Sequence, residues 1–180
     1  PVRLSLGTSH MNKTLKQHTP FASLHGGFTL LEVLVAIVIL SIGLLGLAGL
    51  QAAGLRNNQS AYLRTIATQQ AYDMADRIRA NAAGAGIAAG AYDNISSTGS
   101  NPGCITGGCT PAAMAQYDAY EWNTANASLL PAGKGTVTRV AANRFTITVM
   151  WDDARTGATG VACGSDPAVD LTCFSVSLQP

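Results

Sequence analysis

Histidine is nearly missing from this sequence. Only three of the 180 residues are histidines, and all of them precede residue 26: His10, His18 and His25. The rest of the chain therefore cannot form a Ser-His-Asp or Cys-His catalytic set. A zinc site there would also lack its commonest nitrogen ligand. We expect no enzyme, no cofactor and no metal centre in this protein.

Charged residues are also sparse. Lysine, arginine, aspartate and glutamate make up 12% of the chain, and the formal net charge is +1. Binding to nucleic acid depends on clustered lysine and arginine side chains that neutralise phosphates. This balance gives no such electrostatic footprint, and we expect no nucleic-acid partner.

One long stretch is almost free of charge. Residues 28–50 are predominantly apolar and contain a single charged residue, Glu32. At about 1.5 Å per residue, a helix of this length just spans a hydrocarbon core of about 30 Å. An ionised carboxylate inside lipid costs about 2.5 kcal/mol or more and is normally kept only with a partner. A plain membrane anchor does not explain Glu32, so the carboxylate needs a functional explanation.

The start of this stretch resembles the class III signal of type IV prepilins and type II secretion pseudopilins. The resemblance is carried by GFTLLEVLVA, from Gly27 to Ala36, which follows a basic leader without acidic residues. It implies that a prepilin peptidase cleaves between Gly27 and Phe28 and methylates the new amino terminus on Phe28. It also implies that the Glu32 carboxylate pairs with the N-terminal ammonium of a neighbouring subunit. Two buried opposite charges are tolerable when they are paired, which agrees with that role.

Residues 1–27 form the expected leader. Their charged residues are Arg3, Lys13 and Lys16, so the positive-inside rule predicts a cytoplasmic N-terminus and a periplasmic C-terminal domain. Met11 resembles a native start, which would make residues 1–10 an upstream extension. A secretory signal is the competing interpretation, but its apolar core precedes the cleavage site, whereas here the apolar run follows the two glycines.

The helical pattern continues beyond the apolar run. Residues 51–83 are amphipathic, and one face carries apolar residues at spacings of three and four. These residues are Leu63, Ile66, Ala67, Ala71, Met74, Ala75 and Ile78. We predict one helix from about residue 28 to about residue 82. Its first half would lie in the membrane or filament core, and its second half would pack on a soluble domain.

Residues 84–180 are expected to form one periplasmic globular domain. Its first part, 84–110, is rich in small residues and is predicted to be a surface loop. A helix is predicted from Pro111 to about Leu129, capped by Thr110, with Trp122 as a core anchor. The alternating segments 136–140, 145–151 and 174–178 predict antiparallel strands, with Met150 on the polar face.

The first two strands can be joined as a hairpin through residues 141–143. Asp152 and Asp153 follow them and predict a solvated turn, with a calcium site as the less favoured alternative. The predicted fold class is α+β, a long N-terminal helix packed on a small antiparallel sheet. This architecture also matches the pilin fold that the resemblance implies.

Four cysteines allow three pairings. In a periplasmic domain the local solution pairs Cys104 with Cys109 and Cys163 with Cys173, and each bond would restrain a glycine-rich segment. Zinc binding is the competing interpretation, but these cysteine spacings are not those of the usual zinc sites. We expect two local disulfides.

Later segments resemble the minor pilins known as type IV pilus modification protein PilV. The matching segments are DAYEWN at 118–123, LLPAGKGTV at 129–137 and ITVMW at 147–151. The resemblance implies a structural subunit that primes pilus assembly at the filament tip. The implied partners are other minor and major pilins, prepilin peptidase, the inner membrane and the pilus assembly platform. The subunit would pass from the inner membrane to a cell-surface pilus.

Two other functions remain open from the sequence. A type II secretion minor pseudopilin of the I type shares the N-terminal signal, although such chains are usually shorter and lack a central cysteine loop. A helix-anchored periplasmic adhesion or binding module is the second alternative. That module would show no processing and no partner for Glu32, so processing separates it from both pilin-type functions.

Overall fold

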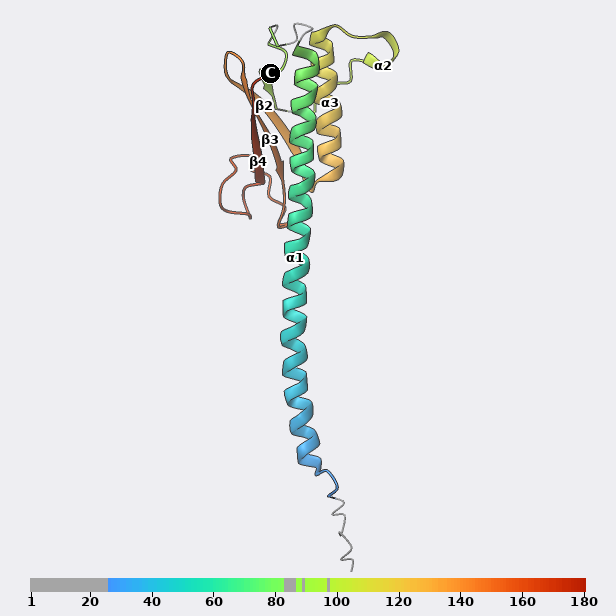
Figure 1. Cartoon of the computed structure of the whole chain (residues 1–180), viewed down its shortest axis with the longest axis vertical. Helices are drawn as coiled ribbons and strands as arrows, with labels where there is room; N and C mark the ends of the chain where they lie inside the picture. The colour runs from blue at the N-terminus through green and yellow to red at the C-terminus, as the bar shows by residue number, and fades with distance from the viewer. Residues whose placement is uncertain (1–25, 83–86, 89, 97) are drawn as a thin grey trace, which may run out of the picture. The chain divides into compact units, whose positions relative to one another are not determined.

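The computed structural model describes residues 26–82, 87–88, 90–96 and 98–180. Most of the expected leader, residues 1–25, lies outside the described residues. The chain divides into two compact units, one that ends at Gly46 and one that covers Leu47–Pro180. Figure 1 shows the secondary structure of both units.

The helix α1 (Leu30–Ala82) is 53 residues long and contributes to both units. It begins after Thr29, whose side-chain oxygen accepts the backbone N–H of Glu32 at 3.2 Å. This contact satisfies one of the amide groups that every helix leaves unpaired in its first turn. The prediction of one continuous helix from about residue 28 to about residue 82 is confirmed to within two residues.

In the second unit, α1 buries one apolar stripe. The buried residues are Leu63, Ile66, Ala67, Ala71, Met74, Ala75 and Ile78, which are the seven that the sequence pattern predicted. They pack in a single core with residues of the sheet and of α3. Because burial begins only at Leu63, residues 51–62 of the predicted amphipathic segment remain largely accessible.

The sheet has four strands in the order β1-β2-β3-β4, and all neighbours are antiparallel. The strands are β1 (Asn94–Ile95), β2 (Lys134–Ala141), β3 (Arg144–Trp151) and β4 (Thr172–Leu178). Ile147 in β3 lies between Val137 in β2 and Val176 in β4, so alternate residues line one apolar face. The predicted hairpin and all three predicted strands are confirmed, and the fold is α+β and pilin-like.

Two further helices follow β1, and α3 contributes to the core. The helix α2 (Cys104–Gly107) is a single turn, and α3 (Pro111–Leu129) is capped by the side-chain oxygen of Thr110 as predicted. Trp122 of α3 is fully buried and donates its indole N–H to the carbonyl oxygen of Gln70 at 2.8 Å. A Cβ on Gly135 would lie 2.3 Å from the Trp122 ring, so β2 can approach α3 only with glycine there. In Figure 1 the second half of α1 runs alongside α3 and the sheet.

The structure corrects three details of the prediction. Residues 84–110 are not only a surface loop, because this segment contains β1 and the fully buried Tyr92. Met150 does not face solvent, since it forms a small second cluster with Ala158 and Leu171. Asp152 is not solvated: it is 6% exposed, and the loop after β3 folds around it.

Candidate functional site

The expected cleavage site lies in an extended segment just before α1. Gly27 and Phe28 are both exposed and non-helical, and Phe28 retains 83% of its accessible surface. Among the described residues, and apart from the adjacent residues of the chain, no atom lies within 4 Å of the position that a Cβ on Gly26 or Gly27 would occupy. Packing in this part of the structure therefore does not require glycine at either position.

Glu32 occupies the first turn of α1. Thr29 and Glu32 have the Thr-x-x-Glu spacing of a capping box, a signal that our sequence reasoning missed. The structure contains one half of that motif, the bond from the Glu32 N–H to the Thr29 side chain. Within the described residues, no hydrogen bond or ion pair involves the Glu32 carboxylate. The helix dipole favours an anion at this end, and the carboxylate remains available to a partner.

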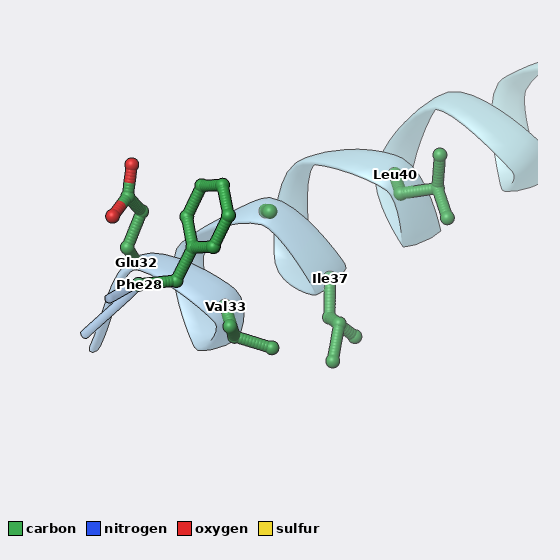
Figure 2. A pocket seen from close by; sticks show the side chains of 6 residues that line it. Phe28, Glu32, Val33, Ile37 and Leu40 are labelled. Carbon is green, nitrogen blue, oxygen red and sulfur yellow. The ribbon is translucent and has the colours of Figure 1, made fainter. Parts of the chain in front are cut away.

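A shallow apolar groove runs along the helix from this carboxylate. Its lining residues recur every three or four positions on one face: Phe28, Glu32, Val33, Ala36, Ile37 and Leu40. Figure 2 shows the Phe28 ring and the Glu32 carboxylate projecting to the same side of the first turn. The groove thus combines an apolar stripe with one anionic group at its end. A second apolar helix that carries a cation near Glu32 would complement both features.

The apolar half of α1 is uncovered. From Phe28 to Leu50, the large apolar side chains keep between 48% and 83% of their surface accessible. An 18-residue window of α1 has a mean hydropathy of 2.8 and no buried residues. Among the described residues, this is the one helix long and apolar enough to cross a membrane. Because the window is unburied, it does not form part of this chain's own core. This helix fits a membrane-anchored protein.

The polar interior of the globular unit forms a connected network. Asp118 is 6% exposed and accepts the phenolic O–H of Tyr92 at 2.5 Å and an Arg77 N–H at 3.3 Å. The Asn81 amide donates to the Tyr92 oxygen at 2.9 Å and to the carbonyl oxygen of Pro111 at 2.7 Å. Burial raises the pKa of the Tyr92 phenol, and its bond to Asp118 raises it further. The network ties α1 to α3 and is a structural feature.

Two aspartates, Asp152 and Asp153, hold the loop after β3 in place through hydrogen bonds. The Asp152 carboxylate accepts the backbone N–H groups of Thr156 at 3.1 Å and Gly157 at 2.8 Å. Asp153 accepts the Ser60 hydroxyl at 2.7 Å and the Trp151 indole N–H at 2.8 Å. These bonds give both carboxylates structural partners. In the part of the chain that the structure describes, no group of three or more potential ligand side chains could hold a metal ion.

Two disulfides stabilise segments that contribute few residues to the hydrophobic core. One joins Cys104 and Cys109 across α2, and the other joins Cys163 in the loop to Cys173 at the start of β4. Both are the local pairs that the spacing predicted. Each closes a short ring, so each restrains the loop in which it lies.

Comparison with known protein families supports the resemblance seen in the sequence. Residues 23–48 match the prokaryotic N-terminal methylation motif, and residues 49–120 match the type IV pilin Tt1218 family. Neither description names the PilV group. No curated protein and no solved structure gave a significant match. The methylation motif covers the groove and Glu32, and the pilin match continues through the packed half of α1 into α3. Together, the two matches support a type IV prepilin family for this chain.

Proposed function

We propose that this protein is a minor pilin, a structural subunit that enters type IV pili and promotes their assembly. Prepilin peptidase removes residues 1–27 and methylates Phe28, and the processed subunit then leaves the inner membrane for the filament. Among the described residues, the Glu32 carboxylate has no hydrogen-bond or ion-pair partner and lies at the end of an exposed apolar groove, and this observation supports the proposal.

The chemistry of assembly follows from that arrangement. Cleavage creates an ammonium group on Phe28, four residues before the carboxylate. In an apolar filament core, each of these charges is costly alone and tolerable when paired. The apolar face of a neighbouring helix covers the groove, while that neighbour's N-terminal ammonium meets Glu32. The pairing fixes the axial register of one helix against the next, since apolar contacts alone permit sliding.

The globular unit favours a pilus subunit over a pseudopilin of the I type. The ring closed by Cys104 and Cys109 lies in the central region, where those pseudopilins usually have no cysteine loop. Other minor pilins and the major pilin are the proposed neighbours, and the assembly platform is the proposed site of incorporation. The cytoplasmic N-terminus and periplasmic globular unit are part of the same proposal.

Recovery from filaments tests this function. The native chain is expressed in a piliated host without a type II secretion system, and in the same host without prepilin peptidase. We expect the protein in sheared pili from the first host and only in the membranes of the second. An adhesion or binding module would stay in the membrane of both hosts, and that result, with abundant pili present, would refute the proposal.

A further inference from the structure

The strand β4 is an unusually unprotected sheet edge. It contains seven residues, whereas β1 at the opposite edge contains two. Its sequence, TCFSVSL, has no charged residue, no proline and no glycine. Natural sheets usually protect exposed edges with short strands, lysine, proline or bulges, because an open edge is a template for another strand. The described part of the sheet ends at β4.

One hydrogen bond of β2 determines toward which neighbouring strand each residue of the sheet directs its backbone N–H and C=O groups. The N–H of Arg139 in β2 donates to the carbonyl oxygen of Asp93, next to β1, at 2.9 Å. In an antiparallel ladder, successive residues direct their N–H and C=O groups to opposite sides of the strand. Thr138 therefore bonds toward β3, where its partner is Thr146.

The same alternation continues to the edge. Ile147, the next residue in β3, bonds toward β4, where its partner is Val176. The residues that alternate with Val176 then direct their backbone groups away from β3. These outward residues are Cys173, Ser175 and Ser177. Within the described residues, their backbone groups have no backbone hydrogen-bond partner, so they present an open edge.

The side chains of β4 define the chemistry of a complementary strand. Phe174 and Val176 lie on the core side of the sheet and are half-buried, while Ser175 and Ser177 are exposed on the other side. The Ser175 hydroxyl already shares a hydrogen bond of 2.8 Å with Thr148. A strand placed beside β4 would extend an apolar surface on one side and a hydroxyl surface on the other. The matching strand is uncharged and alternates apolar with small polar residues.

Contacts within this chain also hold β4 in place without a partner strand. Cys173 is tied to Cys163, and Leu171 just before it is fully buried. The N–H of Leu171 donates to the carbonyl oxygen of Gly160 at 2.9 Å. Because the strand is already ordered by these contacts, little conformational entropy is lost when it pairs.

We propose that the outer edge of β4 pairs with the edge strand on the β1 side of a neighbouring pilin-type subunit. This inference rests on the proposed function. A neighbour whose N-terminal ammonium meets Glu32, and whose helix covers the groove from Glu32 to Leu40, runs in the same direction as this chain. With four antiparallel strands, β1 and β4 run in opposite directions. A neighbour in the same orientation therefore offers its β1-side edge antiparallel to β4, whereas its own β4 would run parallel. The contact is main-chain strand addition, with side-chain fit providing specificity.

Two substitutions at Ser177 separate the effect of its outward backbone N–H from the effect of its side-chain hydroxyl. Ser177→Pro removes this N–H, and proline is tolerated on an edge strand where the N–H faces outward. Ser177→Ala removes the same hydroxyl but keeps the amide, so it is the matched control. Val176→Pro removes an inward ladder bond and serves as the control for a damaged sheet. Each variant is expressed as the full chain in the piliated host, in place of the native copy.

We expect Ser177→Ala to enter sheared pili like the native chain and Ser177→Pro to be recovered about fivefold less, the effect of losing about one net hydrogen bond. Cleavage and membrane levels should be equal for all three, whereas Val176→Pro should be degraded. Equal filament recovery of the proline and alanine variants would overturn the edge pairing. Absence of the native chain from pili would instead refute the proposed function.

A photoreactive p-benzoylphenylalanine at position 177 identifies what lies beside the edge. In assembled pili we expect cross-linked peptides from the sheet edge of another pilin-type subunit. Cross-links confined to helical segments, to a β4 strand or to proteins outside the pilin family would contradict the proposal. The absence of any protein cross-link from a variant that is present in pili would also contradict it.

Discussion

At the scale of single residues, replacing Glu32 should change two free energies in opposite directions, that of membrane insertion and that of incorporation into the filament. Glu32→Ala removes a charge that costs about 2.5 kcal/mol or more in lipid, so the anchor should enter membranes more easily. In the proposed filament the same change removes the partner of the neighbour's ammonium, so recovery in sheared pili should fall. The measurement is the ratio of filament to membrane protein, compared with the native chain at equal cleavage.

Ser41→Ala is a matched control for that substitution. Ser41 is another polar residue of the apolar half, and its hydroxyl is bonded within the helix to the carbonyl oxygen of Ile37 at 2.7 Å. Its removal should leave filament recovery unchanged. If Glu32→Ala and Ser41→Ala are both recovered like the native chain, the pairing role of Glu32 is wrong. A degraded globular unit in Glu32→Ala would assign the carboxylate a folding role instead.

Tyr92 predicts a second residue-level effect, on the pH dependence of stability. Burial and the bond to Asp118 raise the pKa of its phenol in the folded state above the ordinary value near 10. The stabilisation is therefore complete below pH 10 and is lost as the pH rises above it, because the unfolded phenol ionises first. Tyr92→Phe should cost about 1–3 kcal/mol at pH 8, since the Asp118 carboxylate loses a buried donor.

The free energy of unfolding in urea, measured on the detergent-solubilised chain at pH 8 and pH 11, checks this prediction. The stability difference between the native chain and Tyr92→Phe should narrow by about 1.4 kcal/mol at pH 11. Other titrating groups affect both proteins alike and cancel in the difference. A pH-independent difference would show that the Tyr92 phenol titrates equally in the folded and unfolded states.

At the scale of elements, the strongly periodic segments could be predicted from sequence. The stripe from Leu63 to Ile78 and the alternation in β3 each repeat a spacing several times, so their buried faces are specified by local pattern. Thr110 followed by Pro111 located the start of α3 for the same reason, because capping chemistry is local. Glu32 was identified because an ionised carboxylate in an apolar segment has a high free-energy cost in lipid.

The elements that sequence reasoning missed depend on long-range contacts. β1 has two residues, too few to show a period, and it exists because Asn94 and Ile95 meet β2. Tyr92 looks like a loop residue until Asp118 and Asn81 provide polar partners for its hydroxyl. Asp152 appears solvated in the sequence because its two amide donors come from a loop conformation that no local pattern specifies.

The two disulfides give an element-level prediction. Under non-reducing conditions, a peptide map should contain one cross-linked pair from Cys104 and Cys109 and another from Cys163 and Cys173. A peptide linking Cys109 to Cys163 would contradict the local pairing. Cys163→Ser with Cys173→Ser should lower stability more than a surface change does, by about 2–4 kcal/mol, since the loop before β4 loses its closure.

At the scale of the whole molecule, the two units have different roles in the proposed filament assembly. The apolar half of α1 exposes large side chains and one carboxylate that has no partner within the described part of the chain, and such groups are tolerable only in lipid or against other helices. The globular unit has its own core, polar network and disulfides. Filament contacts can therefore form through the helix and the β4 edge without refolding the domain.

In the proposed function, this chain is a pilin subunit matured at the junction between Gly27 and Phe28. The most direct test is the intact mass of the protein recovered from sheared pili. We expect a chain that begins at Phe28 with one added methyl group on its amino terminus. Gly27→Ala should be cleaved poorly, whereas Gly26→Ala should be processed normally. A native chain in pili that still contains Lys13 and Lys16 would show that the protein is not cleaved at this junction.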